Sequence, residues 1–176
     1  KLKFVYAGML YENVDYIFNP LIEVLKKMPS TEAEKFEFNF YGGSEEHYQK
    51  NVLDSKLNNV IKFQGIIPLS DVFNEIQRSD CAMLFLTKDL KDSFSTKFYE
   101  YISQRKFVAV FSDKGETSKF VERNGLGISI TPDNIGESLK ELLILKKRAK
   151  LNTNKSFSIE KYSVKALVEE IEIDLK

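Results

Sequence analysis

Short apolar runs rich in Val, Ile, Phe and Tyr recur along the chain, and this pattern predicts the strands of a buried sheet. Most of the runs end at glycine or serine, which is typical of a strand that leads into a loop. Since the run 107–111 is apolar throughout, this strand is expected to be covered on both faces. The predicted strands are Leu2 to Ala7, Phe36 to Tyr41, Val60 to Phe63, Cys81 to Leu86, Phe107 to Phe111 and Gly127 to Ile130.

Helical spacing of apolar positions separates these strands. Asn19 followed by Pro20 has the form of an N-cap and a first helical residue, although the apolar stripe of this helix extends back to about Val14. Pro29 and the residues after it are expected to stop the helix. The other helices are predicted over 45–57, from Ser70, after Asp92, over 118–123, from Asn134 and from Ser158, the last with Val164, Leu167, Val168 and Ile171 on its apolar face.

Strands and helices therefore alternate, and each connection is long enough for a parallel crossover. The sequence predicts an α/β fold with an open, mostly parallel, Rossmann-like sheet of about six strands and helices on both faces. Neither an internal repeat nor a low-complexity segment interrupts the chain, so residues 1–176 are expected to form a single domain. Ligands of such sheets bind beyond the carboxyl ends of the strands. The residues predicted at that edge are Gly8, Gly42, Gly65, Asp92 and Ser112.

The stretch from Asp92 to Tyr101 carries the clearest chemical signal. Ser95, Thr96 and Lys97 stand where a helix should begin, and the free N–H groups and positive dipole end of a helix start favour an anion. Asp92 and Glu100 flank this turn with seven residues between them. A phosphate-binding turn between two carboxylates that accept hydroxyl hydrogen bonds suits a sugar nucleotide.

Simpler interpretations of the same residues stay open. Ser95 and Thr96 can act only as helix caps, and Asp92 can be a loop carboxylate that favours a helix dipole. Glu100 can be solvated or paired with Lys97. These roles are compatible with an anion site, because a cap leaves further N–H groups free.

Composition excludes several classes of function. Lys plus Arg and Asp plus Glu number 26 each, so no overall charge attracts nucleic acid. A single cysteine excludes an internal disulfide and a multi-cysteine metal site. The chain has neither a Gly-x-Gly-x-x-Gly motif after the first strand nor a Gly-Lys-Ser/Thr motif, which counts against a dinucleotide dehydrogenase and a P-loop NTPase. His47 lies in a polar helix start without a carboxylate-serine pattern and is not expected to be a catalytic base.

No apolar run approaches the ~20 residues that cross a bilayer, and no signal peptide opens the chain. A soluble, cytoplasmic domain is expected. The basic run Lys146-Lys147-Arg148 is interpreted as a solvated helix end, with peripheral contact at the inner face of an anionic membrane as the alternative. Because the chain starts at Lys1 rather than Met, we expect an excised fragment or a processed chain.

Five segments in addition to the central stretch carry a family resemblance. They are Phe4-Val5-Tyr6-Ala7-Gly8, Gly42-Gly43, Val60-Ile61-Lys62-Phe63-Gln64-Gly65, Ser79-Asp80-Cys81-Ala82 and Asn124-Gly125-Leu126-Gly127. Asp92 to Glu100 looks like an acidic-x-Phe-Gly-x-x-x-x-Glu signature. On these residues, essentially the whole chain resembles the C-terminal, donor-binding half of retaining glycosyltransferases of the GT-B fold, of the group 1 or family 4 type.

The resemblance implies a role for each matching residue. Glu100 would accept hydrogen bonds from the ribose hydroxyls and Asp92 would contact hydroxyls of the transferred sugar. The N–H groups of Thr96 and Lys97 would hold a phosphate, and no metal ion or cofactor would be needed. The implied catalytic residues are Asp92 and Lys97, and the implied donor-binding residues are Gly8, Gly42, Gly65, Ile67, Ser95, Thr96, Lys97 and Glu100.

This sequence departs from the family pattern at several positions. Asp92 replaces the usual Glu, and Ser95 stands where Gly is common, although a related subgroup has Pro-Ser-Lys in place of residues 95–97. Met9 follows Gly8 where the family often has Arg, and residues 13–15 lack the usual Lys. The charge of the departing diphosphate would therefore be met by Lys97, by the helix or by the other half of the enzyme.

The function implied is binding of a UDP- or GDP-type sugar and its transfer, with retention, to a saccharide or lipid-linked acceptor, as in polysaccharide biosynthesis. An N-terminal acceptor domain would complete the enzyme, so the isolated fragment is expected to be inactive. The alternatives are a sugar-nucleotide epimerase of the same fold and a non-catalytic nucleotide-binding or interaction module.

Overall fold

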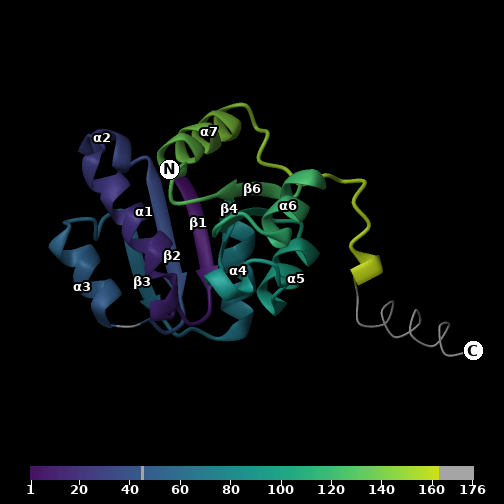
Figure 1. The fold of residues 1–176 in the computed structure, drawn as a ribbon, viewed down its shortest axis with the longest axis horizontal. Helices are drawn as coiled ribbons and strands as arrows, with labels where there is room; N and C mark the ends of the chain where they lie inside the picture. Colours follow the sequence, from purple (N-terminus) through teal and green to yellow (C-terminus); the bar gives the residue numbers. More distant parts are fainter. Residues whose placement is uncertain (45, 163–176) are drawn as a thin grey trace, which may run out of the picture.

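Within the described residues, the protein is built on one parallel sheet of six strands. Figure 1 shows β3, β2 and β1 side by side. The computed structural model describes residues 1–44 and 46–162. The strands follow the order β3-β2-β1-β4-β5-β6, in which the direction of winding reverses between β1 and β4. The strands are β1 Leu2–Ala7, β2 Phe36–Tyr41, β3 Ile61–Gly65, β4 Cys81–Phe85, β5 Phe107–Phe111 and β6 Gly127–Ile130. The predicted strands and their parallel arrangement are confirmed.

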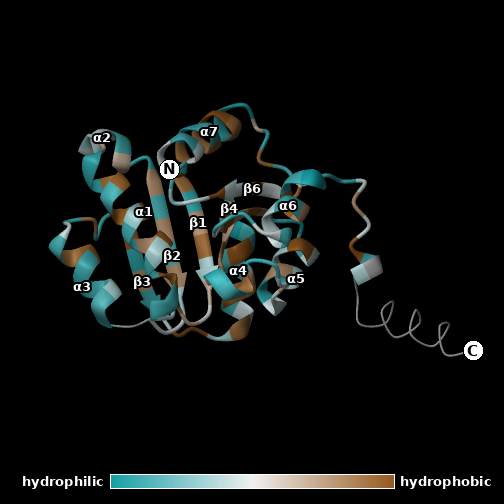
Figure 2. Ribbon diagram, viewed as in Figure 1, coloured by the Kyte–Doolittle hydropathy of each residue, from teal (hydrophilic) through white to brown (hydrophobic). Residues whose placement is uncertain are grey.

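Helices cover both faces of this sheet, as the sequence predicts. Side chains of α1, α3 and α7 join one buried cluster, and those of α4, α5 and α6 join the other. Figure 2 shows hydrophobic residues on the strands and on the helix sides turned toward them. The helices are α1 Asp15–Lys27, α2 Ser30–Ala33, α3 Glu46–Asp54, α4 Leu69–Arg78, α5 Thr96–Ser103, α6 Glu116–Arg123 and α7 Ile135–Lys147, with short 3-10 turns at η1 Glu12–Val14, η2 Lys88–Leu90 and η3 Glu160–Tyr162.

The start of α1 differs from the N-cap prediction at Asn19 and Pro20. Pro20 lies inside α1, which begins at Asp15. Proline removes one hydrogen bond from a helix, but Ile17 and Phe18 are fully buried in the core and stabilise the turn before it. The apolar stripe that reached back to Val14 is therefore the better signal for this helix.

Two further differences concern helix ends. Pro29 does stop α1, but it also precedes the short helix α2, which the sequence analysis missed. The predicted terminal helix from Ser158 begins in a segment that holds only the turn η3. Its apolar positions at 164–171 lie outside the described residues.

Candidate functional site

The strand order reverses between β1 and β4, and we call the carboxyl edge of the sheet at this reversal the crevice. These strands pair only at Phe4 with Cys81 and at Val5 with Ala82, although β1 continues to Ala7 and β4 to Phe85. The reversal of strand order at this point is where open α/β sheets bind their ligands.

Three of the predicted glycines lie together at this edge. The Gly8 N–H donates to the Tyr41 carbonyl oxygen at 2.7 Å, and the Gly42 N–H donates to the Gly65 carbonyl oxygen at 2.8 Å. All three have positive φ, at 129°, 125° and 74°, which favours glycine. A Cβ atom on Gly42 would lie 2.5 Å from the Gly8 carbonyl oxygen. The loops after β1 and β2 therefore pack backbone against backbone. Half-buried Ile67 follows Gly65 in the loop after β3.

Lys97 lies directly over the Gly8 turn. A Cβ atom on Gly8 would be 2.3 Å from Lys97 Cε and 2.7 Å from Nζ. The Nζ atom lies 5.5 Å from the centroid of the Tyr6 ring, in a cation–π geometry. Among the described residues, no carboxylate forms an ion pair with Lys97. Its ammonium group can therefore bind an anion at the mouth of the crevice.

The start of α5 faces the same region with free backbone donors. Ser95 is the N-cap, and its hydroxyl accepts from the Phe98 N–H at 3.3 Å. Within residues 1–44 and 46–162, the N–H groups of Thr96 and Lys97 donate to no protein acceptor. The predicted cap is confirmed, and two donors are left for a ligand.

Asp92 has a structural role that the sequence analysis missed. Its Oδ1 accepts from the Glu116 N–H at 2.8 Å, at the start of α6. On either side, the Lys91 carbonyl oxygen accepts from the Thr117 N–H at 3.3 Å and the Ser93 carbonyl oxygen from the Thr117 hydroxyl at 2.9 Å. The β4–α5 connection is thus held on the first turn of α6. The helix that Asp92 caps is α6, and the residue's catalytic role stays a prediction.

Two substitutions separate the effect of the Asp92 hydrogen bond from the effect of the Asp92 charge. Asp92→Ala should lower the free energy of unfolding by about 0.5–2 kcal/mol, because the Glu116 N–H loses its acceptor. Asp92→Asn keeps an oxygen acceptor and should stay within about 0.5 kcal/mol of wild type, since Asn caps as well as Asp. Urea denaturation measures both. Equal destabilisation by the two substitutions would mean that the charge, not the hydrogen bond, supports α6.

Glu100 is exposed on α5, one turn after Thr96. No ion pair joins it to Lys97 in the described part of the chain, so the pairing alternative is wrong. It borders an open hollow of about 380 Å³ together with Tyr99, Ser103 and Tyr162. The carboxylate is therefore free to accept hydrogen bonds from a ligand.

Two tyrosines organise the crevice without having been singled out in the sequence. The buried Tyr101 hydroxyl accepts from the Ala7 N–H at 3.1 Å. The Tyr16 hydroxyl donates to the Leu86 carbonyl oxygen at 2.6 Å and accepts from the Asp113 N–H at 3.3 Å. Burial raises the pKa of both phenols, so each stays protonated. They fasten α5 to β1, and α1 to the ends of β4 and β5.

His47 has two carboxylate neighbours that are distant in sequence, and its expected lack of a catalytic role stays a prediction. Its Nε2 lies 3.1 Å from Asp15 Oδ1, and its Nδ1 lies 3.8 Å from Glu12 Oε1. The ring packs on Tyr48 at 4.0 Å between centroids. This contact links α3 to the start of α1. Among the described residues, no group of three His, Cys, Asp or Glu side chains could hold a metal ion.

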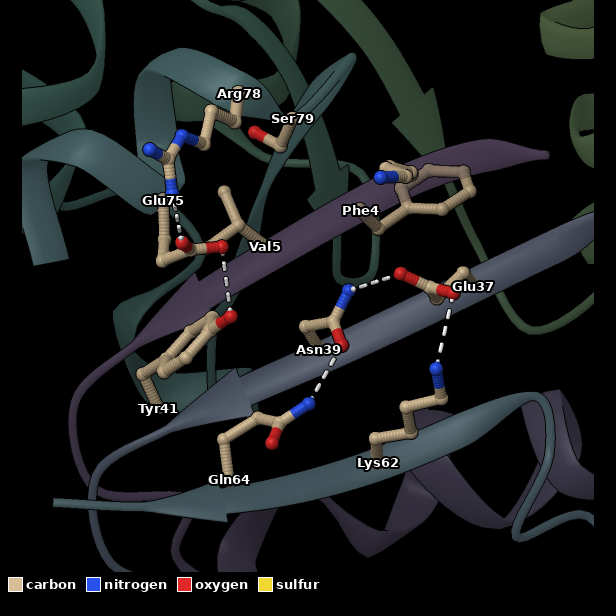
Figure 3. A pocket seen from close by; sticks show the side chains of 11 residues that line it. Phe4, Val5, Glu37, Asn39, Tyr41, Lys62, Gln64, Glu75, Arg78 and Ser79 are labelled. Carbon is tan, nitrogen blue, oxygen red and sulfur yellow. Dashed lines mark hydrogen bonds and ion pairs between the residues drawn. The ribbon is translucent and has the colours of Figure 1, made fainter. Parts of the chain in front are cut away.

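A separate polar pocket of about 290 Å³ lies on the open face of β2 and β3, next to α4 (Figure 3). Most of its polar side chains bond to one another, and Lys3 also lines it. Glu37 accepts from Asn39 at 3.1 Å and Lys62 at 3.0 Å, Asn39 accepts from Gln64 at 3.0 Å, and Glu75 accepts from Tyr41 at 2.9 Å and Arg78 at 3.2 Å. This network accounts for the polar side of β2, where Glu37, Asn39 and Tyr41 alternate with phenylalanines, and it lines the part of the sheet next to α4.

Several solved glycosyltransferases share this fold. HepE from Anabaena, in complex with UDP and glucose, is 14% identical with a TM-score of 0.69, over 99% of this chain and 48% of HepE. The pneumococcal O-GlcNAc transferase GtfA, in complex with UDP and GlcNAc, is 18% identical with a TM-score of 0.66, over 98% of this chain and 35% of GtfA. The C-terminal domain of LpcC, a glycosyl transferase group 1 family protein from Francisella tularensis, is 16% identical with a TM-score of 0.65, over 93% of this chain and 87% of the LpcC domain.

The chain has the fold of the C-terminal domain of a GT-B glycosyltransferase. It spans less than half the length of HepE and GtfA but most of the LpcC domain. No protein-family model and no curated protein matches the sequence. None of the helices described between residues 1 and 162 is long and apolar enough to cross a membrane. The predicted fold is confirmed, whereas the roles of individual site residues stay predictions.

Proposed function

We propose that this chain binds a nucleoside diphosphate sugar and forms the donor half of a retaining glycosyltransferase that needs no metal ion. In the full-length enzyme, an acceptor hydroxyl would attack the anomeric carbon and a nucleoside diphosphate would leave. The position of Lys97 carries this proposal, since its ammonium lies over the Gly8 turn beside the free N–H groups of α5. The presence of UDP in HepE and GtfA supports a nucleotide as the ligand.

The proposed chemistry depends on position and charge. The donor domain would hold the anomeric carbon of the sugar nucleotide next to the acceptor hydroxyl, which for retention must attack on the face that the diphosphate leaves, and fixed cations and N–H dipoles would stabilise the charge that develops on the leaving diphosphate. Lys97 and the Thr96 and Lys97 N–H groups would supply that stabilisation. Glu100 would orient the ribose. The acceptor site and the rest of the cleft would come from a second domain.

Calorimetric titration with UDP, GDP and ADP tests this function. One of these should bind and, at tenfold excess over its dissociation constant, stabilise the domain by about 1.4 kcal/mol, or about 3–6 °C in melting temperature at this size. Glu100→Ala should weaken that binding about two- to tenfold, the net value of one or two hydrogen bonds. Glu141→Ala, which removes an exposed carboxylate in the middle of α7, is the control and should bind like wild type.

The outcomes separate the alternatives. Absence of binding by all three diphosphates, in the presence of a folded domain, would favour a non-catalytic interaction module. Binding that Glu100→Ala does not weaken would retain a nucleotide site but contradict the ribose contact. An epimerase predicts turnover of the free nucleotide sugar by the full-length enzyme without any acceptor.

A further inference from the structure

Lysines at both ends of the β4–α5 connection lie on tyrosine rings from the β1–α1 segment. Lys88, in the turn η2 just after β4, has its Nζ 5.2 Å from the centroid of the Tyr16 ring. Lys97, in the first turn of α5, has its Nζ 5.5 Å from the centroid of the Tyr6 ring. The connection thus places one ammonium group at each end against the β1–α1 segment.

Both rings are fixed to the carboxyl edge of the sheet. The Tyr16 hydroxyl bonds to the backbone at Leu86 and at Asp113, where β4 and β5 end. Tyr6 is buried in β1, and its hydroxyl donates to the Met9 carbonyl oxygen at 2.7 Å. Because the rings cannot move without breaking these bonds, they set where the two lysines lie, on either side of the strand reversal.

Neither ammonium group is neutralised by the protein. Within the described residues, no carboxylate lies within ion-pair distance of Lys88 or Lys97. An exposed cation–π contact is worth only about 0.5–1 kcal/mol and leaves the ammonium N–H groups free. Lys91, between them in the same connection, differs because its Nζ lies 3.8 Å from Asp92 Oδ2 and 3.4 Å from the Lys114 carbonyl oxygen.

We propose that Lys88 is a second ligand of the donor's diphosphate, acting with Lys97 from the β4 side of the crevice. This inference rests on the proposed function. The loop after β1 offers Met9 and no cation next to Gly8, so a diphosphate at this edge needs positive charge from elsewhere. Lys88 supplies it from the connection that already carries Lys97, and Tyr16 is the residue that positions Lys88.

The test compares two lysines of one connection. The nucleoside diphosphate that binds wild type most tightly is titrated into Lys88→Met, Lys88→Arg and Lys91→Met. Lys88→Met should weaken binding about 10- to 100-fold through the loss of a charge-assisted contact, and Lys88→Arg should restore most of the affinity. Lys91→Met removes the same charge three residues away and should change affinity less than about twofold, the effect of a screened surface charge.

Ionic strength provides a readout that a merely structural role would not change. Affinity for the diphosphate should fall less steeply with added salt in Lys88→Met than in wild type, because one attractive charge is missing. Equal affinities and equal salt dependences of Lys88→Met and Lys91→Met would overturn the role of Lys88 while leaving the donor site intact. Failure of the wild-type chain to bind UDP, GDP or ADP would overturn both proposals together.

Discussion

Gly8→Ala should weaken nucleoside diphosphate binding by about 10- to 100-fold, the value of one charge-assisted contact to Lys97. The Gly8 N–H is already bonded to Tyr41, so the glycine contributes space rather than a donor. An added Cβ would overlap the end of the Lys97 side chain, and that flexible end would swing away from the crevice. The positive φ of 129° adds strain of about 1–3 kcal/mol to the folded state.

Gly125→Ala is the matched control for this substitution. Gly125 also has a positive φ, 64°, but it lies just before β6, and a Cβ there would approach only Asn154 Cβ, at 3.3 Å. It should therefore show the backbone strain in urea denaturation without displacing Lys97. If Gly8→Ala and Gly125→Ala lose the same affinity in calorimetry, the loss comes from strain in the loops and not from the lysine.

A double substitution tests whether Gly8→Ala lowers affinity by displacing Lys97. If Gly8→Ala acts by displacing Lys97, then adding Gly8→Ala to Lys97→Met should cause little further loss of affinity, since the shared contact is already gone. Additive losses would mean that Gly8 and Lys97 contribute separately to the site.

The sheet was predictable because its signals are local. Buried strands are short apolar runs, and five of the six strands were found with bounds that match to within one residue, such as Phe36–Tyr41 and Phe107–Phe111. Parallel connection then brings the carboxyl ends of the strands to one edge, which explains why Gly8, Gly42 and Gly65 could be grouped from sequence. The N-cap at Asn19 was wrong because a local preference of Pro20 was overridden by burial of Ile17.

The contacts within the site were not predictable, because they join distant residues. Asp92 bonds to Glu116 across 24 residues, Tyr101 to Ala7 across 94 and Tyr16 to Leu86 across 70. Nothing in the neighbourhood of such a residue in sequence encodes its partner. The signature from Asp92 to Glu100 therefore predicted a helix start that can bind an anion, but not that Asp92 caps a different helix.

These long-range bonds explain how a site of exposed residues is kept in place. The β4–α5 connection is held by α6 at Lys91 to Ser93 and ends at the Ser95 cap. Lys97 then leaves a fixed helix start and rests on the Tyr6 ring. A preorganised cation loses little entropy on binding, which is consistent with the proposed role of Lys97 at a leaving diphosphate.

Lys97→Met should accordingly weaken nucleoside diphosphate binding about 10- to 100-fold, with loss of a charged hydrogen bond worth about 1.5–3 kcal/mol. Methionine keeps an apolar chain over the Tyr6 ring, so the melting temperature should fall by no more than about 4 °C, the value of an exposed cation–π contact. Lys97→Arg keeps the charge but places a planar guanidinium group over Gly8. Its affinity for the diphosphate should lie between those of the wild type and Lys97→Met. Calorimetry and thermal denaturation on the same samples separate binding from folding. A folded Lys97→Met domain that binds the diphosphate like wild type would contradict the assignment of this lysine and leave the anion to the N–H groups of α5.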